Sequence, residues 1–379
     1  MKREYSICAK TVMDTSDPEI EFDDNGISNH WHNYFKRQQR IHYDHKFRDL
    51  HQKKLVSEIK THGKNKVYDS IIGVSGGVDS TYVCYLAKEL GLKPLAVHFD
   101  NGWNSEIAVS NIEKTLAKLD IDLYTYVIDW NEFKDLQLSF LKASTPDGEV
   151  PTDHGMIALL YKIANQHGIK HILTGVNFKT ESVLPLKWGY GYFDLKYIKS
   201  VHKKFGSQKL KTYPSLSLLK LFYFSNLRGI KFISFLDYVD YDKKEAIRLI
   251  SDKLDWTDYG GKHYESVYTR FYQSYILPYK HNIDKRRAHL SNLICSGQIT
   301  RAQALKELQK ETYPKEKIKS EKKFVANKFG LTIDEFERLL LKENKTFKDY
   351  NTNYELFEFL KKIKRFAKKY FNISILEIE

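Results

Sequence analysis

The sequence contains little cysteine and no long apolar run. Its 379 residues include only Cys8, Cys84 and Cys295, which are far apart and form no CxxC pair. A disulfide framework is therefore excluded, and thiol-transfer chemistry loses support. The strongly apolar stretches are short runs such as residues 157–160, far below the about 20 residues that a membrane span needs. The N-terminal residues lack the apolar segment of a secretory signal, so we expect a cytoplasmic protein without a membrane span.

Basic residues outnumber acidic ones. There are 61 Lys and Arg residues against 48 Asp and Glu residues, which gives a net charge of +13. Such an excess favours an anionic partner such as nucleic acid. Part of it, however, lies in a predicted C-terminal helix, where Lys361, Lys364 and Lys368 surround an apolar stripe that includes Leu360 and Ile363. We favour a solvated helix face here and expect no nucleic-acid partner, although a sugar nucleotide or an anionic membrane surface could also use these charges.

From residue 67 onward, short apolar runs alternate with helical periodicities. This pattern is typical of βα units and predicts an α/β fold with a parallel sheet and flanking helices. The predicted strands are 70–74, 95–99, 123–128, 171–174 and 230–235. A third helix of this region is expected to begin near a capping Asp153 and to end at Gly168. We divide the chain into an irregular N-terminal arm (1–62) that leads into a helix, the α/β domain (63–258) and a mainly helical region (259–379).

A glycine-rich loop follows the first predicted strand and leads into a helix at about Asp79. Its residues are Ser75, Gly76, Gly77, Val78, Asp79 and Ser80. Paired glycines let backbone N–H groups approach an anion, and the helix N-terminus adds partial positive charge. The loop has no lysine and is shorter than a Walker A loop, which disfavours γ-phosphoryl transfer. We predict a phosphate-binding loop with Asp79 as a Mg²⁺ ligand, directly or through water. The alternative is a tight βα turn.

The same loop resembles the signature of the PP-loop ATP pyrophosphatases, which include GMP synthetase, asparagine synthetase and several tRNA-modifying enzymes. The resemblance implies an adenine nucleotide alpha hydrolase-like sheet. It also implies that an acyl oxygen attacks the α-phosphate of ATP, pyrophosphate leaves, and a nucleophile then displaces AMP. Further residues lie at strand ends, where such a fold would hold ATP and Mg²⁺. They are Val97, Asp100 and Asn101 at the end of the second strand, and Thr174, Gly175 and Asn177, with the expected catalytic Glu181, at the end of the fourth. A simple loop turn explains Asp100 and Asn101 equally well.

Nearly the whole chain also resembles the N-acetyl sugar amidotransferases of bacterial O-antigen and surface-sugar synthesis. The segments that carry this likeness are 11–15, 184–191, 194–198, 259–266 and 284–290. The resemblance implies conversion of a sugar N-acetyl group, on a nucleotide sugar such as a UDP-diacetamido sugar, into an acetamidino group. ATP would adenylylate the amide oxygen, and ammonia would displace AMP. Because the chain shows no glutaminase Cys-His-Glu arrangement, we expect the ammonia to come from a separate glutaminase in a complex with a channel.

Several residues in these segments suit such a substrate. Lys262 and Glu265 are expected to be catalytic, and Glu265 could position ammonia or accept its proton. Side chains that could bind a diphosphate or a sugar carboxylate cluster in the same segments. The expected substrate-binding residues are Lys187, Trp188, Lys196, His263, Tyr264, Lys285, Arg286 and Arg287. Surface ion pairs or core contacts are the alternative for each of them. The aromatic run from Tyr264 to Tyr275 has helical spacing and predicts core packing.

One departure from the family concerns the N-terminal arm. The family usually carries two CxxC pairs there, which look like a zinc site. Here Cys8 survives, and Thr11, Ser28 and Trp31 occupy the other matching positions. We therefore predict no structural zinc and leave open what holds the arm. Two rival functions remain: a PP-loop tRNA-modifying ligase, which the positive charge favours, and a non-catalytic nucleotide-binding scaffold, which the intact loop disfavours.

Overall fold

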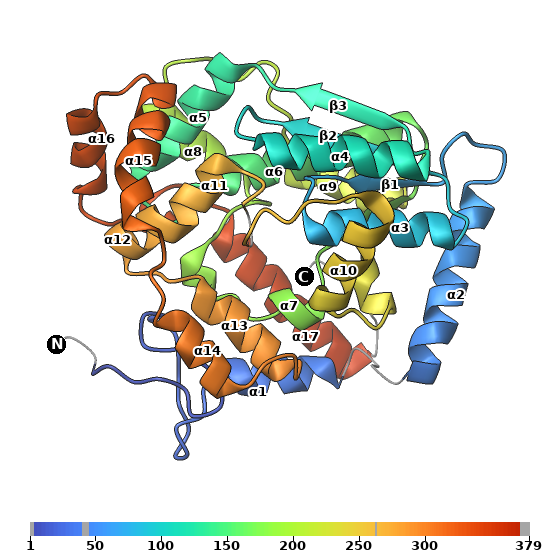
Figure 1. Ribbon diagram of the computed structural model, residues 1–379, viewed down its shortest axis with the longest axis horizontal. Coiled ribbons are helices and arrows are strands. Elements are labelled where there is room, and N and C mark those ends of the chain that lie inside the picture. Colours follow the sequence, from blue (N-terminus) through green and yellow to red (C-terminus); the bar gives the residue numbers. More distant parts are fainter. Residues whose placement is uncertain (1–3, 40–44, 262–263, 372–379) are drawn as a thin grey trace.

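The computed structural model describes residues 4–39, 45–261 and 264–371, and within these ranges helices surround one five-stranded parallel sheet (Figure 1). The strand order is β3-β2-β1-β4-β5. The strands are β1 (Ser70–Gly73), β2 (Pro94–Asp100), β3 (Leu123–Val127), β4 (His171–Thr174) and β5 (Lys231–Ser234). Every predicted strand is present, and the predicted α/β fold with a helical C-terminal region is confirmed.

The sheet separates two apolar layers. Ile71 on β1 pairs with Ile172 on β4, and both side chains lie in a core shared with α5 and α6. The next pair, Ile72 with Leu173, lies in a second core shared with α3, α4 and α10. Parallel strands that are covered on both faces need apolar side chains pointing both ways, which explains the short unbroken apolar runs in the sequence. The edge strand β3 is largely exposed instead.

The helices of the α/β domain follow their strands. They are α3 (Val78–Glu89), α4 (Glu106–Leu119), α5 (Trp130–Ala143), α6 (Val150–Gln166), α7 (Phe178–Glu181), α8 (Leu195–Phe205), α9 (Leu218–Phe222) and α10 (Lys243–Leu254), with short turns η1 (Leu186–Trp188), η2 (Tyr223–Leu227) and η3 (Phe235–Tyr238). Ser105 and Asp129 cap α4 and α5. The predicted cap Asp153 is wrong, because α6 begins a turn earlier with Glu149 at its N-cap and Pro151 in its first turn.

Two helices occupy the N-terminal region, α1 (Asn29–Gln38) and α2 (His45–His62). The side chains of Leu55, Val56 and Ile59 on α2 lie in the same core as α3. Although the predicted division at residue 62 assigns α2 to the arm, this helix packs with the α/β domain. Figure 1 shows α2 standing beside the end of the sheet at which the strands begin.

The C-terminal region is helical, as predicted. Its elements are α11 (Val267–Phe271), η4 (Tyr272–Ile276), α12 (Leu277–His281), α13 (Arg286–Cys295), α14 (Arg301–Leu308), α15 (Lys315–Phe329), α16 (Ile333–Leu340), η5 (Phe347–Asp349) and α17 (Tyr354–Phe371). Tyr268, Phe271 and Tyr272 are buried, which confirms core packing for the centre of the aromatic run. Thr332 and Glu335 form a capping box at the start of α16. No helix among the described residues is both long and apolar enough to span a bilayer.

Arginines from α13 and α14 hold the N-terminal arm. Arg301 donates through Nε to the carbonyl oxygens of Cys8, at 3.2 Å, and Thr11, at 2.9 Å. Arg287 forms an ion pair with Asp14 at 3.0 Å. The Cys8 sulfur accepts hydrogen bonds from the backbone N–H groups of Thr11 and Ser28. Hydrogen bonds and ion pairs to the helical region therefore fix this arm.

Candidate functional site

The glycine-rich loop lies at the carboxyl end of β1, where the strand order changes direction between β1 and β4. Ligands of open α/β sheets bind at such a switch point. Gly76 has φ +77°, and a Cβ there would lie 2.3 Å from the carbonyl oxygen of Ala108, so only glycine fits. Gly77 is the N-cap of α3. The loop thus presents backbone N–H groups at a helix N-terminus, as a phosphate site requires.

The end of β4 packs closely against the start of α3. A Cβ on Gly175 would lie 2.7 Å from the Asp79 Cβ and 3.0 Å from the Ser80 nitrogen. Thr174 Oγ1 donates to the carbonyl oxygen of Ile233 at 3.2 Å. Asn177 caps α7, because its Oδ1 accepts the N–H of Thr180 at 3.0 Å. Gly175 therefore allows the close approach, while Thr174 and Asn177 shape the rim, and ATP contacts of these three residues stay predictions.

Asp79 has a partner that the sequence did not reveal. Tyr241, which precedes α10 and is almost fully buried, donates its hydroxyl hydrogen to Asp79 Oδ1. Burial and the Asp79 carboxylate raise the pKa of Tyr241 far above its usual range, and Glu181 adds to this shift. The phenol therefore stays protonated and orients the carboxylate. Asp79 and the predicted catalytic Glu181 are thus brought to one side of the loop.

The chain between α10 and α11 covers the other side of the loop. Trp256 donates through Nε1 to the carbonyl oxygen of Gly76 at 2.9 Å. A Cβ on Gly77 would lie 3.2 Å from the Tyr259 hydroxyl oxygen and 3.8 Å from the carboxyl carbon of Glu265. Burial and the Glu265 charge raise the pKa of Tyr259. The predicted catalytic Glu265 and Tyr259 therefore both lie beside Gly77 of the phosphate-binding loop.

A backbone pairing fixes the position of Glu265. The N–H of Ser105 donates to the Glu265 carbonyl oxygen at 2.9 Å, and the N–H of Val267 donates to Trp103 at 2.9 Å. These bonds join the start of α11 to the loop that follows β2. In Figure 1 the arrowhead of β3 points toward the side on which α11 and α15 lie, so the helical region closes the carboxyl ends of the parallel strands.

The residues that follow β2 mainly build their own turn. Asp100 Oδ1 accepts hydrogen bonds from the N–H of Gly102 at 2.9 Å and from Asn104 at 3.0 Å. Asn101 is buried, and its side chain accepts the N–H of Trp103 at 3.1 Å. These contacts favour the loop-turn interpretation of Asp100 and Asn101. The side chain of Val97 lies in the apolar core, as does that of Val78 in the loop itself.

His98, one residue after Val97, links this turn to the phosphate-binding loop. Asn104 donates through Nδ2 to His98 Nε2 at 3.0 Å, and His98 Nδ1 is 2.9 Å from the carbonyl oxygen of Val74. Nδ1 therefore donates to the Val74 carbonyl oxygen while Nε2 accepts from Asn104. The imidazole therefore acts as a structural link between the ends of β1 and β2.

Buried carboxyl groups gather at the same rim. Burial raises the pKa of Glu149 to about 7, and the charges of Asp153 and Glu265 raise it further while Lys285 lowers it. Burial raises the pKa of Asp147 to about 6, although it accepts hydrogen bonds from Tyr190 and Tyr197. A carboxyl group that titrates near neutral pH can accept or hold a proton during a reaction. No sequence pattern predicted a role for Glu149, because Glu265 and Lys285, whose charges shift its pKa, are brought near it only by the fold.

The predicted substrate-binding residues separate into several places. Lys285 lies with the buried carboxyl groups, since its charge lowers the pKa of both Asp147 and Glu149. Arg286 is bound to Asp284 at 2.7 Å and to the carbonyl oxygen of Lys310 at 2.9 Å, which ties α13 to the end of α14. Arg287 holds the arm. Both arginines serve structural contacts, and substrate binding by them stays a prediction.

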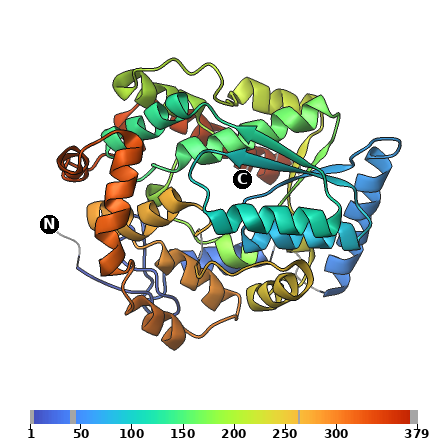
Figure 2. The same ribbon diagram turned by 45° about the horizontal axis from the view of Figure 1, so that its top comes forward.

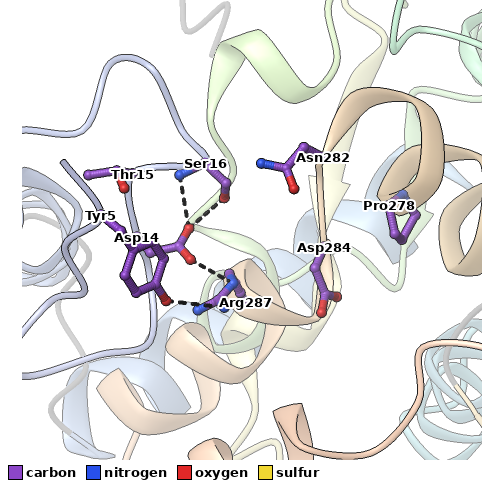
Figure 3. Close-up of a pocket in the computed structure, with 8 residues that line it drawn as sticks. All are labelled: Tyr5, Asp14, Thr15, Ser16, Pro278, Asn282, Asp284 and Arg287. Carbon is purple, nitrogen blue, oxygen red and sulfur yellow. Dashed lines mark hydrogen bonds and ion pairs between the residues drawn. The ribbon is translucent and has the colours of Figure 1, made fainter. Parts of the chain in front are cut away.

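Arg287 also lines a pocket between the arm and the start of α13 (Figure 3). Figure 3 shows its guanidinium group facing Asp14 and the hydroxyl group of Tyr5. The lining residues are Tyr5, Asp14, Thr15, Ser16, Pro278, Asn282, Asp284 and Arg287. None of them belongs to the phosphate-binding loop or to the strand ends beside it.

The remaining predicted substrate contacts are scattered. Lys187 pairs with Glu19 of the arm at 3.6 Å, and Lys196 is exposed on α8. Trp188 is completely buried in the core, so it offers no surface to a substrate in this structure. Tyr264 is partly buried, with the Arg270 guanidinium 5.2 Å from its ring centroid. Lys262 and His263 lie outside the described residues.

Two family models match different parts of the chain. Residues 50–214, which contain the glycine-rich loop, match the NAD synthase family. Residues 265–364 match the family described as "LPS biosynthesis protein WbpG-like, C-terminal domain". The chain therefore combines a region similar to NAD synthase, which contains the PP-loop, with a WbpG-like C-terminal region. The second match begins at Glu265, the residue that lies against the PP-loop, so the two matched regions meet at the site.

A relative found by comparison with individual proteins matches a short part of this chain. A tRNA(Ile)-lysidine synthase from Chlamydia pneumoniae is 37% identical over 71 residues, which are 18% of this chain and 22% of that protein. The chain thus matches only about a fifth of that relative's length.

Three solved structures share low sequence identity with this protein. They are a predicted tRNA methyltransferase subunit from Methanocaldococcus jannaschii (14% identity, 48% of this chain and 75% of that chain, TM-score 0.28), an NMN synthetase from Francisella tularensis (15%, 57% and 89%, 0.30) and an NH3-dependent NAD synthetase from Campylobacter jejuni (18%, 55% and 87%, 0.29). Similarity at these values supports no conclusion about activity.

Proposed function

We propose that this PP-loop protein is an ATP-dependent amidotransferase that converts the N-acetyl group of a nucleotide sugar, such as a UDP-diacetamido sugar, into an acetamidino group. The observation that carries the proposal is the position of Glu265. This carboxyl group begins the WbpG-like region and lies beside Gly77 of the PP-loop. A group able to handle ammonia therefore adjoins the place where ATP would activate an amide.

The loop residues fit ATP and Mg²⁺. Gly76 and Gly77 leave a cradle that a Cβ would fill, and the N-terminus of α3 opens onto it. Asp79, oriented by Tyr241, would hold Mg²⁺ directly or through water. The metal ion would supply positive charge to balance the leaving pyrophosphate. Ser75 and Ser80, which are partly exposed at the loop, add hydroxyl groups to the same cradle.

The reaction has two bond exchanges. The amide oxygen of the N-acetyl group attacks the α-phosphorus of ATP, and the bond to pyrophosphate breaks. Ammonia then attacks the activated carbon, loses a proton to a carboxylate, and AMP leaves with the former amide oxygen. Glu265 or Glu149 would receive that proton, and the pKa of Glu149 near 7 suits a base at neutral pH. Lys285, beside Glu149, would bind an anionic group of the substrate.

The ammonia would come from a partner glutaminase, because the three cysteines of this chain are all buried and none is placed as a nucleophile. A second candidate function is that of a PP-loop tRNA-modifying ligase. The short match to the lysidine synthase and the net charge of +13 favour it. Both functions use the same ATP chemistry and differ in the acyl substrate.

Mass spectrometry separates these functions. UDP-diacetamido sugars are incubated with the full chain, ATP, Mg²⁺ and ammonium, and a loss of about 1 Da is expected as NH replaces O, together with AMP and pyrophosphate. Pyrophosphate release that depends on tRNA and not on the sugar would overturn the proposal in favour of the ligase. Absence of release with either substrate would support the scaffold interpretation instead.

A further inference from the structure

Three potential metal ligands lie together at the end of the sheet opposite the PP-loop. Glu58 and His62 are four positions apart on α2, so their side chains share one face of the helix. His171 is the first residue of β4. One ligand atom from each of the three residues lies within 4.8 Å of the other two. A helix and a strand thus converge on one point, which no local pattern in the sequence predicts.

The two imidazole rings have nitrogens that need a partner. His171 is completely buried, and neither of its ring nitrogens has a hydrogen-bond partner among the described residues. The same holds for Nδ1 of His62 within the described part of the chain. The Glu58 carboxylate lies beside both rings, and its Oε1 is 3.5 Å from His171 Nε2 and 4.0 Å from His62 Nδ1. Buried polar atoms are nearly always bonded, so these nitrogens point to a missing ligand.

We propose that Glu58, His62 and His171 bind a divalent transition-metal ion of the Zn²⁺ or Co²⁺ class. Two imidazole nitrogens with one carboxylate form a donor set that such ions prefer, whereas Mg²⁺ and Ca²⁺ prefer oxygen ligands alone. Tetrahedral bonds of about 2.0–2.2 Å place neighbouring donor atoms about 3.4 Å apart. The Glu58 carboxylate lies 3.5 and 4.0 Å from the two histidines, and all three donor atoms lie within 4.8 Å of one another, so side-chain rotation must shorten the longer separations by up to about 1.4 Å. Solvent would fill the fourth position.

Lys231 is the main competitor for the carboxylate. Its Nζ is 2.6 Å from Glu58 Oε1. The lysine side chain is 56% exposed on the edge strand β5, where an ion pair is weak and the lysine can move into solvent. Without a metal, the site is a pair of rings stacked 5.2 Å apart beside a Glu–Lys ion pair.

The position of the proposed metal site determines which parts of the fold the metal ion would join. His171 begins β4, while Gly175, beyond the other end of that short strand, packs against Asp79 of the PP-loop. A metal ion at His171 would join α2 to the amino ends of the strands, on the side of the sheet that Figure 1 shows next to α2. We expect it to stabilise this junction. The proposal does not depend on the amidotransferase reaction, because the PP-loop is at the opposite rim.

Co²⁺ binding tests the proposal. The full chain is treated with a chelator, dialysed and titrated with Co²⁺, and the visible absorption reports nitrogen-containing, four-coordinate ligation. We expect one Co²⁺ per chain, displacement by Zn²⁺, and a rise in the melting temperature. His62→Ala is expected to weaken binding at least about tenfold. His171→Ala should weaken Co²⁺ binding similarly, but replacing this buried residue can also destabilise the fold. His62 is partly exposed, so His62→Ala is the variant expected to keep the fold.

Two further variants sharpen the outcome. His32 is exposed, and its Nε2 lies 2.9 Å from Asp23 Oδ2, but the described part of the chain offers no third ligand there. His32→Ala is therefore the matched control and should bind Co²⁺ normally. Lys231→Met removes the competitor and should tighten binding. The proposal is overturned if His62→Ala and His171→Ala, shown to be folded by circular dichroism, bind Co²⁺ as the unaltered chain does. It is also overturned if the unaltered chain gives no Co²⁺ absorption.

Discussion

The hydroxyl group of Tyr241 donates a hydrogen bond to the carboxylate of Asp79, although the two residues are 162 positions apart in the chain. Because burial and the Asp79 charge raise the pKa of Tyr241, the phenol remains a donor throughout the physiological range. Asp79 is therefore held in one orientation before ATP or Mg²⁺ arrives. This relationship makes Tyr241 a positioning residue for the proposed metal ligand.

Tyr241→Phe tests that role. Loss of the hydrogen bond should raise the Mg²⁺ concentration needed for half-maximal pyrophosphate release about tenfold, and lower the free energy of unfolding by about 1–3 kcal/mol. The matched control is Tyr82→Phe, since Tyr82 packs 5.8 Å from the Tyr241 ring and its hydroxyl is not bonded to Asp79. If both variants show the same Mg²⁺ dependence, the positioning role is wrong.

Asp79→Asn tests the metal ligand itself. The amide keeps an oxygen that can accept from Tyr241 but loses the negative charge that Mg²⁺ requires. We expect turnover to fall on the order of 100-fold with an unchanged melting temperature. Steady-state assays of AMP formation give the rate. Full turnover by Asp79→Asn or Asp79→Ala would overturn the assigned mechanism.

Gly76→Ala and Gly77→Ala should behave differently. A Cβ on Gly76 meets backbone at 2.3 Å in a left-handed conformation, so this variant should lose roughly 1–3 kcal/mol of stability. A Cβ on Gly77 meets side-chain oxygens at 3.1 and 3.2 Å, which can shift, so the protein should fold. Gly77→Ala should weaken ATP binding about tenfold, or about 1.4 kcal/mol, because the methyl group enters the cradle. Calorimetry with a non-hydrolysable ATP analogue measures the binding affinity. Equal affinity in Gly77→Ala and the unaltered chain would show that the cradle formed by the two glycines does not hold phosphate.

The pH dependence of the protein's stability should reflect the titration of Glu149. Its folded-state pKa of about 7 lies above the ordinary value of 4.5, so folding favours the protonated form. This contribution to stability is complete below pH 4.5 and is lost as pH rises through about 7, by at most about 3 kcal/mol. Glu149→Gln should remove that decline in denaturant titrations. If Glu149 accepts a proton during turnover, the rate of the unaltered chain should rise with pH near 7, and Glu149→Gln should lose this rise. A Glu149→Gln variant that keeps both pH effects would contradict the assignment of the pKa near 7 to Glu149.

Arg301→Ala tests how the arm is held. Its guanidinium group donates to two arm carbonyl oxygens, so its loss should cost about 1.5–3 kcal/mol and expose residues near Cys8 to proteolysis. Turnover should change little, because these contacts do not reach the PP-loop. Arg338→Ala, at an exposed position on α16, is the control for loss of charge. Limited proteolysis followed by mass spectrometry identifies the cleavage sites, and unchanged cleavage would show that other contacts hold the arm.

The sequence alone was sufficient for the strands and the PP-loop. Each strand is a short apolar run bounded by polar or glycine residues, and Ser75 to Ser80 adjoin one another, so local periodicity and spacing specify them. The prediction of a helix cap was wrong because residues outside the capping pattern determine where α6 begins. Asp153 has the chemistry of a cap, but Pro151 can occupy the first turn and α6 starts earlier. Trp188 is buried in the core, Arg286 is bound to Asp284 and Arg287 is bound to Asp14, and substrate binding by these three residues stays a prediction.

Only the tertiary structure could decide which distant residues meet. Parallel strands deliver their ends to two opposite rims, so residues far apart in sequence converge there while sequence neighbours do not. At one rim this brings Tyr241, Glu149 and Glu265 to the loop that the sequence already marked. At the other it brings His171 to Glu58 and His62. The sequence by itself therefore determined the strands and the phosphate-binding loop, through interactions within a few residues; the acid groups and imidazoles around them depend on long-range packing, which no local pattern encodes.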